Sequence, residues 1–429
     1  MASSLVVLVC RIGNVREHKN AAMLGIAEVL GYQTVVGLVE NPNGTIVRNF
    51  LKDQRDEKGK RIPVLGNAGL FGSGEPVVVK PHIDCDPNGP GITRWFWTED
   101  REGNKTFIDP SKVETLKFSF RHNEGDLVVY VPGDSLLTDE WATKLDVKSL
   151  LKGGNRVAKI ALRGEPSFGL VIEIPADKKG VWQEGDNVAD YFGITKYEPP
   201  VKTTTGDAAK YDSEIDPYFD KFTDIQSGRL YTSVFTVGER VVMSEKLHGT
   251  NVRVGCINGH KVAGSMELRR SPPVDANYTK STYWFPWSIP GVVQLIEDLS
   301  IEHKVVELFG EVYGNSIQAG FKYDAGNGVG FRSFGIKIND RFLDWDDFAS
   351  KCAEYSIPMV TVLYDGPFDF AKITALIERD STLGNAPVME GGVAVAVPER
   401  TDPKVGRAIL KYISYRYDLL KNKPDSKDV

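Results

Sequence analysis

EKLHGTN, residues 245–251, follows a β-patterned run and ends it at a glycine. A lysine placed where a strand breaks at a glycine can be held rigidly and still reach into a pocket, and Lys246 has that position. Taken alone, the tetrapeptide KLHG is also typical of an ordinary surface lysine before a turn. The segments around it have to decide between the two interpretations.

Four further segments follow in order along the chain, each a strand-like run with one residue of chemical interest. They are ELFGEVYG (307–314) with Glu311, FRSFGIKI (331–338) with Phe334, MEGGVAV (389–395) with Glu390, and RAILKYISYRY (407–417) with Lys411. Each has an ordinary interpretation when taken alone. The carboxylates could lie at exposed strand ends, the phenylalanine could belong to a core, and the late lysine could be solvated. Their common order is the informative feature.

The ordered series resembles the covalent nucleotidyltransferases, which are the polynucleotide ligases and the mRNA capping enzymes. Their motifs are KxDG or KxHG, an arginine soon after, FGE, an aromatic strand, EG with an aliphatic residue, and a late lysine. Histidine in place of aspartate makes EKLHGTN similar to the ATP-dependent RNA ligases. YFDKFTDI (218–225) resembles the approach to the ligase domain in the same group. The resemblance implies an enzyme, an ATP-dependent RNA ligase.

The N-terminal half is similar to the OB-fold domain that some RNA ligases carry ahead of the catalytic domain. Short strand-like runs separated by turn residues favour a small β-barrel there. One exception is AAMLGIAEVLG (21–31), whose apolar pattern predicts a helix. The segments that resemble the OB domain are RIGNVREHKNAAMLGIAEVLGY (11–32), GDLVVYVPGDSLL (125–137), KIALRGEPSFGL (159–170) and YFGITKYEPP (191–200).

We therefore expect an α+β protein. Residues 1–197 would form an OB-fold-like β-barrel domain with a large insertion at about 40–122, where Gly, Pro and charged residues dominate. Residues 198–216, rich in Pro, Thr, Gly and Asp, would be a linker. Residues 217–429 would form the nucleotidyltransferase domain. Its strand and helix candidates do not alternate as in a Rossmann fold, so we expect antiparallel sheets flanked by helices.

Composition excludes several classes of protein. The net charge of -6 is unlike that of a protein that wraps nucleic acid passively, because phosphate neutralisation supplies most of the affinity there. No apolar run approaches the roughly 20 residues of a membrane span, and the first apolar run is too short for a signal peptide, so we expect a cytoplasmic protein. Four scattered cysteines without a CxxC pair argue against disulfides and zinc.

The resemblance implies a role for each residue of the series. Lys246 would attack the α-phosphate of ATP, and because a free lysine is almost fully protonated at neutral pH, neighbouring cations must disfavour its charged form. Glu311 and Glu390 would hold Mg²⁺, with Mn²⁺ as an alternative, since Mg²⁺ takes few carboxylates and keeps several waters. The other expected ATP or AMP contacts are Glu245 beside the nucleophile, Asn251 near the α-phosphate and metal, Phe334 on the adenine and Lys411 on the α-phosphate.

Three assignments near the site have competing interpretations. The family arginine that binds the ribose or phosphate falls within GSMELRR (264–270), and we choose Arg269 over Arg270. The family often shows a second basic residue close to the late lysine, but position 413 is isoleucine, which leaves open whether Arg407 substitutes. We expect His248 to shape the turn and the ribose pocket, and not to act as a general base.

The implied partner is RNA with 5′-phosphate and 3′-hydroxyl ends, either a nicked duplex or a broken strand, joined through lysyl-AMP and RNA-adenylate in RNA repair. We expect a monomer without a membrane partner. A DNA ligase is one alternative, and KLHG speaks against it. A capping guanylyltransferase is another, but those enzymes carry the OB domain after the catalytic domain. An inactive RNA-binding relative is disfavoured because the lysines and both glutamates are present.

Overall fold

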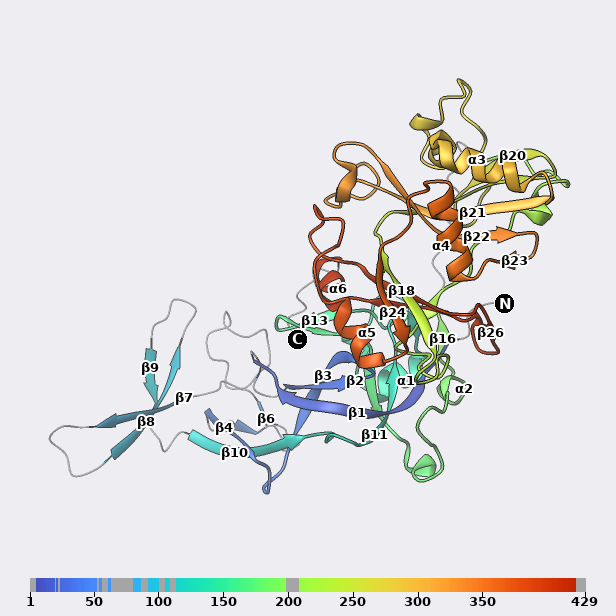
Figure 1. Ribbon diagram of the computed structural model, residues 1–429. Coiled ribbons are helices and arrows are strands. Elements are labelled where there is room, and N and C mark those ends of the chain that lie inside the picture. Colours follow the sequence, from blue (N-terminus) through green and yellow to red (C-terminus); the bar gives the residue numbers. More distant parts are fainter. Residues whose placement is uncertain are drawn as a thin grey trace. The chain divides into compact units, whose positions relative to one another are not determined.

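The computed structural model describes residues 5–19, 21, 24–51, 54–55, 61–62, 80–85, 92–99, 105–108, 113–197 and 208–421 (Figure 1). The chain divides into two compact units, one within 4–198 and the other within 199–421. Both contain antiparallel sheets and short helices, which confirms the expected α+β class. In the part of the chain so described, no helix is both long and apolar enough to cross a membrane.

The N-terminal unit is built on one seven-stranded sheet with the strand order β15-β11-β1-β2-β3-β10-β4. Valines on one face of β1 and β11, Val9 and Val129 among them, are fully buried and start its core. The strands of the sheet are β1 (Leu8–Glu17), β2 (Leu24–Val29), β3 (Tyr32–Glu40), β4 (Ile46–Leu51), β10 (Val113–Phe120), β11 (Leu127–Val131) and β15 (Leu170–Glu173).

Smaller elements complete this unit. Two short helices, α1 (Asp139–Lys144) and α2 (Ala189–Phe192), pack against the core through Ala142 and Phe192. The paired short strands are β12 (Ser135–Leu136) with β16 (Thr195–Lys196), β13 (Ile160–Leu162) with β14 (Glu165–Ser167), and β5 (Gln54–Arg55) with β6 (Arg61–Ile62). A three-stranded sheet contains β7 (Lys80–Cys85), β8 (Ile92–Glu99) and β9 (Lys105–Ile108).

The helix predicted over 21–31 was wrong. Its described part is strand β2, which forms a hairpin with β3 in which Val29 pairs with Tyr32. Leu30 and Gly31 both have positive φ, 53° and 71°, which is the backbone of the two-residue turns that suit a twisted hairpin. The apolar residues of such a short run fit a strand as well as a helix, and pairing with a neighbouring strand decided between them.

The expected insertion at about 40–122 begins and ends within the main sheet. β10 pairs with β3 at one end, where Phe118 lies opposite Glu40, and with β4 along most of its length. Both strands therefore extend the sheet. Much of the segment between them lies outside the described residues, as does 198–207 of the expected linker.

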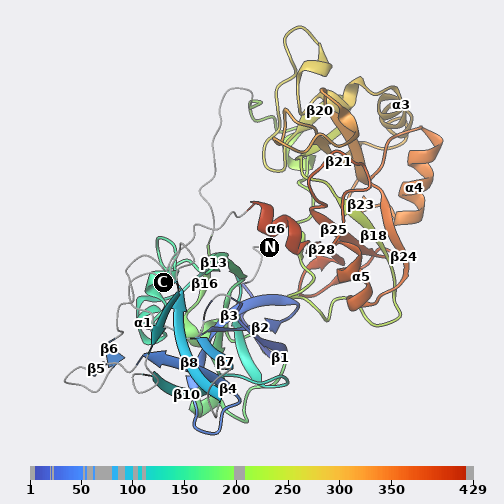
Figure 2. The same cartoon turned by 90° about the vertical axis from the view of Figure 1, so that its left-hand side faces the viewer.

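Two five-stranded sheets form the C-terminal unit. The first has the order β20-β19-β21-β22-β23 and the second β17-β28-β25-β18-β24, whose strands lie next to one another in Figure 2. The first contains β19 (Thr250–Ile257), β20 (His260–Gly264), β21 (Val305–Tyr313), β22 (Gly330–Ile338) and β23 (Arg341–Phe342). The second contains β17 (Gln226–Ser227), β18 (Arg240–Lys246), β24 (Val362–Pro367), β25 (Gly391–Ala396) and β28 (Ile409–Ile413).

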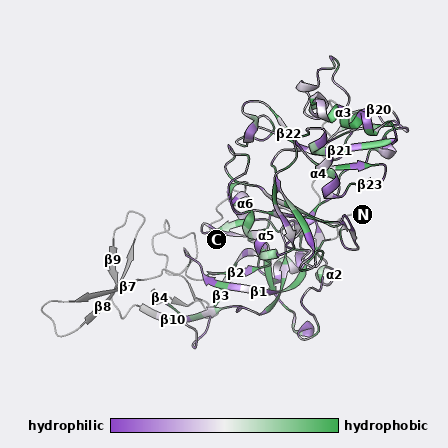
Figure 3. Ribbon diagram, viewed as in Figure 1, coloured by the Kyte–Doolittle hydropathy of each residue, from purple (hydrophilic) through white to green (hydrophobic). Residues whose placement is uncertain are grey.

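The two sheets face each other across a shared apolar cluster. Val242 and Ile409 of the second sheet pack there with Phe309 of the first and with Phe222. The opposite face of the first sheet buries α3 and α4, and α3 carries both apolar and polar residues, as expected of a helix with one buried face (Figure 3). The remaining elements are α3 (Pro290–Leu299), α4 (Trp345–Glu354), α5 (Phe370–Leu376), α6 (Tyr415–Lys421), β26 (Thr401–Asp402) and β27 (Gly406–Arg407).

Candidate active site

Lys246 lies where the chain passes from one sheet to the other. It is the last residue of β18, in the second sheet, and Thr250 begins β19 in the first. Gly249 is required between them, because a Cβ there would come within 2.3 Å of the Val312 carbonyl oxygen. The strand break at glycine that the sequence predicted is therefore the crossing between the two sheets.

Strand pairing brings the expected glutamates to this crossing. Lys246 lies opposite Gly391 on β25, so Glu390 comes directly before the paired residue. On the other sheet Asn251 lies opposite Glu311. Glu311 shares a strand face with Phe309, which belongs to the cluster between the sheets, since alternate residues of a strand point the same way.

The nucleophile candidate is held as an ion pair. Lys246 Nζ lies 2.7 Å from Glu390 Oε1, and the two side chains are 28% and 9% exposed. Burial lowers the pKa of Lys246, but Glu390 and Glu311 outweigh it and raise this pKa above its ordinary value. Burial also raises the pKa of Glu390, but the positive charge of Lys246 is the largest of the influences that bring it below its ordinary value. Lys246 is thus an ammonium in the free protein.

Glu311 is the second acidic group near Lys246. Burial raises its pKa to about 8, Lys246 acts in the opposite direction, and the Gly249 N–H donates to the carboxylate. At neutral pH the surroundings of Lys246 therefore contain one ionised carboxylate, Glu390, and a second carboxyl group, Glu311, that loses its proton readily when another cation approaches.

The donor set fits a hard divalent cation. Within the described residues, no group of three His, Cys, Asp or Glu side chains is arranged to hold a metal ion alone. However, Glu390 Oε2 and Asn251 Oδ1 are buried oxygens that find no hydrogen-bond partner among the described residues. Mg²⁺ and Mn²⁺ prefer oxygen ligands, and Mg²⁺ in particular takes only one or two carboxylates beside water and phosphate oxygens. These two oxygens suit such an ion.

The comparisons with known proteins agree with this arrangement. Residues 239–413, from just before β18 to the end of β28, match the family model described as RNA ligase. Residues 239–413 form an RNA ligase domain. The resemblance drawn from the sequence is thereby confirmed, and with it the assignment of the chain to the ligase enzymes. Comparison with curated proteins gives no match.

Solved structures of Naegleria gruberi RNA ligase share the fold of this chain. Three mutants of that enzyme, one with ATP and Mn, one without ligand and one with AMP and Mn, are 18% identical to the chain, with TM-scores of 0.56, 0.57 and 0.55. The alignments cover 97%, 99% and 97% of this chain and 99% of each of those chains. At this identity the likeness shows the fold alone.

His248 of the RNA ligase domain is fixed from three sides. Its backbone N–H donates to Tyr323 Oη at 2.8 Å. Its ring packs edge-on against Phe321, with 4.7 Å between centroids. Its Nδ1 lies 3.1 Å from Tyr417 Oη and 3.6 Å from Glu390 Oε2. Sequence reasoning missed Tyr417, although it stands in the quoted segment RAILKYISYRY; only its spacing after Lys411 could have indicated it.

The carboxylate of Glu245 is engaged away from Lys246. It accepts from Ser381 Oγ at 2.6 Å, from the Thr382 N–H at 3.0 Å, and from the Thr382 hydroxyl. Consecutive residues of a strand point to opposite faces, so Glu245 and Lys246 diverge. The side chain thus anchors residues 381–382 to β18, and the predicted ATP contact of Glu245 stays a prediction.

Phe334 and Lys411 lie on the inner faces of the two sheets. Phe334 packs edge-on against Phe222, with 4.8 Å between ring centroids, and contacts two apolar clusters. Ile409 and Ile413 belong to these same clusters, so Lys411, between them on β28, shares their face. Both placements agree with the expected roles at the adenine and the α-phosphate, which stay predictions.

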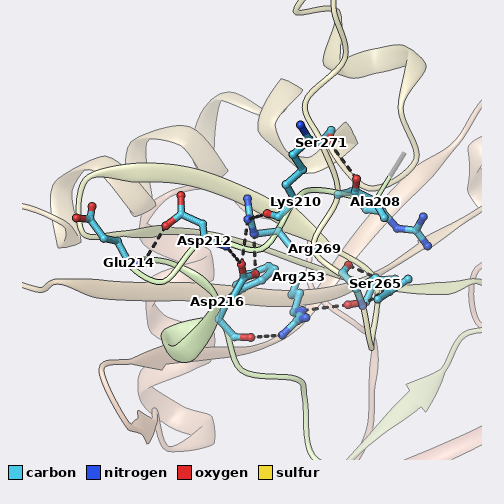
Figure 4. A network of polar contacts seen from close by, with 12 residues as sticks. Ala208, Lys210, Asp212, Glu214, Asp216, Arg253, Ser265, Arg269 and Ser271 are labelled. Carbon is cyan, nitrogen blue, oxygen red and sulfur yellow. Dashed lines mark hydrogen bonds and ion pairs between the residues drawn. The ribbon is translucent and has the colours of Figure 1, made fainter. Parts of the chain in front are cut away.

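Arg407 and the two candidate arginines have other contacts. Arg407 forms two 2.8 Å bonds to Glu399 and lies 4.0 Å from the Phe342 ring centroid, so its guanidinium is committed to that pair. Arg269 bonds Asp216 at 2.8 and 3.0 Å and also the Lys210 carbonyl (Figure 4). Arg270 is buried with its guanidinium 4.6 Å from the Tyr283 ring. Arg269 therefore anchors the segment before the ligase domain.

Proposed function

We propose that this chain is an ATP-dependent RNA ligase that joins 3′-hydroxyl and 5′-phosphate RNA ends through lysyl-AMP and RNA-adenylate. The observation that carries the proposal is the 2.7 Å pair of Lys246 with Glu390, at the crossing between two sheets and beside the buried Glu311. The match of residues 239–413 to the RNA ligases supports it, as do the ATP, AMP and Mn in the named Naegleria structures.

In the first step the Lys246 amine attacks the α-phosphorus of ATP, forming an N–P bond while the bond to the leaving pyrophosphate breaks. Lys246 must first give up a proton, which the ionised Glu390 opposes. A bound divalent cation supplies charge that neutralises this carboxylate and the phosphates. Lys411 would then hold the α-phosphate, Asn251 would lie beside it, and Phe334 would stack on the adenine.

Two transfers complete the reaction. A 5′-phosphate oxygen of one RNA end takes AMP from Lys246, and the 3′-hydroxyl of the other end then displaces AMP to form the phosphodiester. The protein contributes mainly positioning and charge stabilisation in such transfers. We propose that the N-terminal unit, expected as an OB-type domain, helps to hold the RNA, and that the physiological role is RNA repair.

The decisive experiment is the intact mass of the protein after incubation with Mg²⁺ and either ATP or GTP. We expect a gain of one AMP with ATP, none with GTP, and none for Lys246→Ala. Lys261→Ala is the matched control, because that lysine is exposed on β20, where it pairs with Glu297 and lies 4.8 Å from the Trp287 ring centroid. No adduct on the wild type, even after pyrophosphate removal, would refute the ligase assignment.

Sealing assays then identify the substrate. Nicked duplexes with RNA or DNA on each side of the nick, and single-stranded RNA with matching ends, are compared at equal enzyme concentration. Sealing that requires an RNA 3′-hydroxyl strand supports an RNA ligase, whereas equal sealing of an all-DNA nick favours a DNA ligase. An adduct with GTP in place of ATP would indicate a capping-type enzyme.

A further inference from the structure

Helix α6 brings a tyrosine hydroxyl close to the polar groups around Lys246. Tyr417 Oη lies 3.1 Å from His248 Nδ1, and the same nitrogen lies 3.6 Å from Glu390 Oε2. Both aromatic residues are buried, and the other carboxylate oxygen of Glu390 is taken by Lys246 at 2.7 Å. A row of neighbouring polar groups thus leads from Tyr417 through His248 and Glu390 to Lys246.

The distances indicate which atom of this row carries a proton. If His248 Nδ1 were protonated, the Glu390 carboxylate would be its best acceptor, and charge-assisted bonds of this kind are about 2.7–2.9 Å long. The observed 3.6 Å is longer than a hydrogen bond, whereas 3.1 Å to the tyrosine is within the usual range. Burial and the nearby Glu390 raise the pKa of Tyr417, so its hydroxyl keeps a proton to donate.

An unprotonated His248 Nδ1 explains why Glu390 Oε2 accepts no hydrogen bond from the imidazole. In the part of the chain that the structure describes, Glu390 Oε2 is buried without a hydrogen-bond partner, although an imidazole lies beside it. An imidazole that accepts from Tyr417 at Nδ1 has no proton there to give to the carboxylate. Glu390 Oε2, to which the histidine donates no hydrogen bond, is one of the two oxygens that suit a divalent cation.

We propose that Tyr417 is a positioning residue, whose hydroxyl donates to His248 Nδ1 and thereby keeps Glu390 Oε2 open for the divalent cation. This inference rests on the proposed ligase function, because it assumes that Glu390 binds the cation. Without the hydroxyl, the imidazole keeps its packing against Phe321 but can shift its proton to Nδ1, move closer to Glu390 Oε2 than the present 3.6 Å, and donate to it. The histidine would then compete with the metal.

The first test compares Tyr417→Phe with the wild type in AMP-adduct formation over a range of Mg²⁺ concentrations. Loss of one hydrogen bond of ordinary strength predicts about a three- to tenfold rise in the half-saturating Mg²⁺ concentration. The deficit should shrink at saturating metal, whereas a general structural defect would lower the rate at every concentration. Tyr415→Phe is the control, because its ring lies on the same helix but faces Arg229, 5.1 Å from the guanidinium.

The second test needs neither metal nor catalysis. Long-range ¹H–¹⁵N correlation of the metal-free protein reports which ring nitrogen of His248 is protonated, with its signals identified by their loss in His248→Gln. We expect an unprotonated Nδ1 in the wild type and in Tyr415→Phe, and a protonated Nδ1 in Tyr417→Phe. Because the wild-type spectrum alone is informative, the test does not depend on how well the variant folds.

The outcomes separate this inference from the proposed function. A protonated Nδ1 in the wild type, or an unchanged Mg²⁺ dependence in Tyr417→Phe, overturns the role of Tyr417 while adduct formation still supports the ligase. An unprotonated Nδ1 in a protein that never forms an adduct supports the contact but overturns the ligase. The expected spectrum together with the shifted Mg²⁺ dependence supports both.

Discussion

Lys246 Nζ and Glu390 Oε1 are 2.7 Å apart although 144 residues separate them in the chain. The contact follows from the register of β18 and β25, in which Lys246 lies opposite Gly391. In the free protein this contact holds the nucleophile in its unreactive, protonated form. Under the proposed function, Glu390 would have two partners in succession, the ammonium first and a divalent cation when ATP is bound.

Glu390→Gln tests this exchange of partners. Removing the carboxylate lowers the pKa of Lys246, because Glu390 is the first of the two charges that raise it. The rate of adduct formation rises with pH while Lys246 loses its proton, so the profile of the variant should move to lower pH. The maximal rate should fall about 100-fold, as when a group that stabilises transferred charge is removed. Single-turnover adduct formation between pH 5 and 10 measures both effects.

The matched control is Glu297→Gln, an exposed residue of α3 that pairs with Lys261. It should reproduce the wild-type profile. If Glu390→Gln also kept the wild-type rate and pH profile, neither the ion pair nor a metal contact of Glu390 would matter for the first step.

The strands that present Lys246, Glu311, Phe334 and Glu390 could be predicted because each is an apolar run interrupted by glycine. Such runs are recognised from composition and period alone, and the order they share with the family is what predicts a site there. The direction in which each side chain points was harder to predict from the sequence. Glu245 precedes Lys246 and was expected to contact ATP, yet its carboxylate accepts hydrogen bonds from Ser381 and Thr382. No local sequence pattern indicates that residues 381–382 approach β18.

Arg269→Ala should lower stability and leave ATP binding unchanged. Its guanidinium makes two bonds to Asp216, and the side chains of the pair are only 15% and 22% exposed. Losing charge-assisted hydrogen bonds of this kind costs about 2 kcal/mol in the free energy of unfolding. Denaturant unfolding and the KM for ATP in adduct formation measure the two quantities separately.

Arg416→Ala is the control for Arg269, because its pair with Asp380 is 46% and 76% exposed and should contribute little. A double-mutant cycle of Arg269→Ala with Asp216→Ala should show strong coupling. If Arg269→Ala instead raised the KM for ATP at unchanged stability, the nucleotide role assigned from sequence spacing would be correct and the anchoring role wrong.

The choice between Arg269 and Arg270 illustrates what sequence spacing leaves undetermined. Both arginines fit the family distance from Lys246, and their contacts depend on Asp216 and Tyr283, which no motif includes. Tyr417 was missed for the same reason, because only the position of α6 shows that its hydroxyl contacts His248. Long-range side-chain pairing, and not strand location, was the information that the sequence lacked.

Phe334→Ala should weaken ATP binding more than it weakens the fold. The ring is half-buried and touches Phe222 edge-on, which leaves part of its surface for a base. Loss of one base–aromatic stack costs about 1–3 kcal/mol, so the KM for ATP in adduct formation should rise about 5- to 150-fold. Phe334→Tyr keeps the ring and should stay close to the wild type. Equal KM values for all three proteins would contradict adenine stacking at this position.

Glu307→Gln should stabilise the RNA ligase domain at neutral and mildly alkaline pH. Glu307 is fully buried on β21, and neither of its carboxylate oxygens has a hydrogen-bond partner within the described ranges. Burial raises its pKa from 4.5 to about 8, although Lys337 and Arg253 oppose the rise. Between these two values the folded state keeps a proton that the unfolded state has lost, so stability falls as pH rises through this range.

The glutamine has no proton to lose, so this fall should disappear in the variant. Denaturant unfolding followed by tryptophan fluorescence, at intervals from pH 4 to 9, gives the difference in unfolding free energy between the two proteins. That difference should be nearly constant below pH 4.5, change in favour of Glu307→Gln up to about pH 8, and then level off. Glu297→Gln should show no such trend. A difference that stayed flat across the whole range would show that Glu307 ionises at its ordinary pH, with Lys337 or Arg253 as its direct partner.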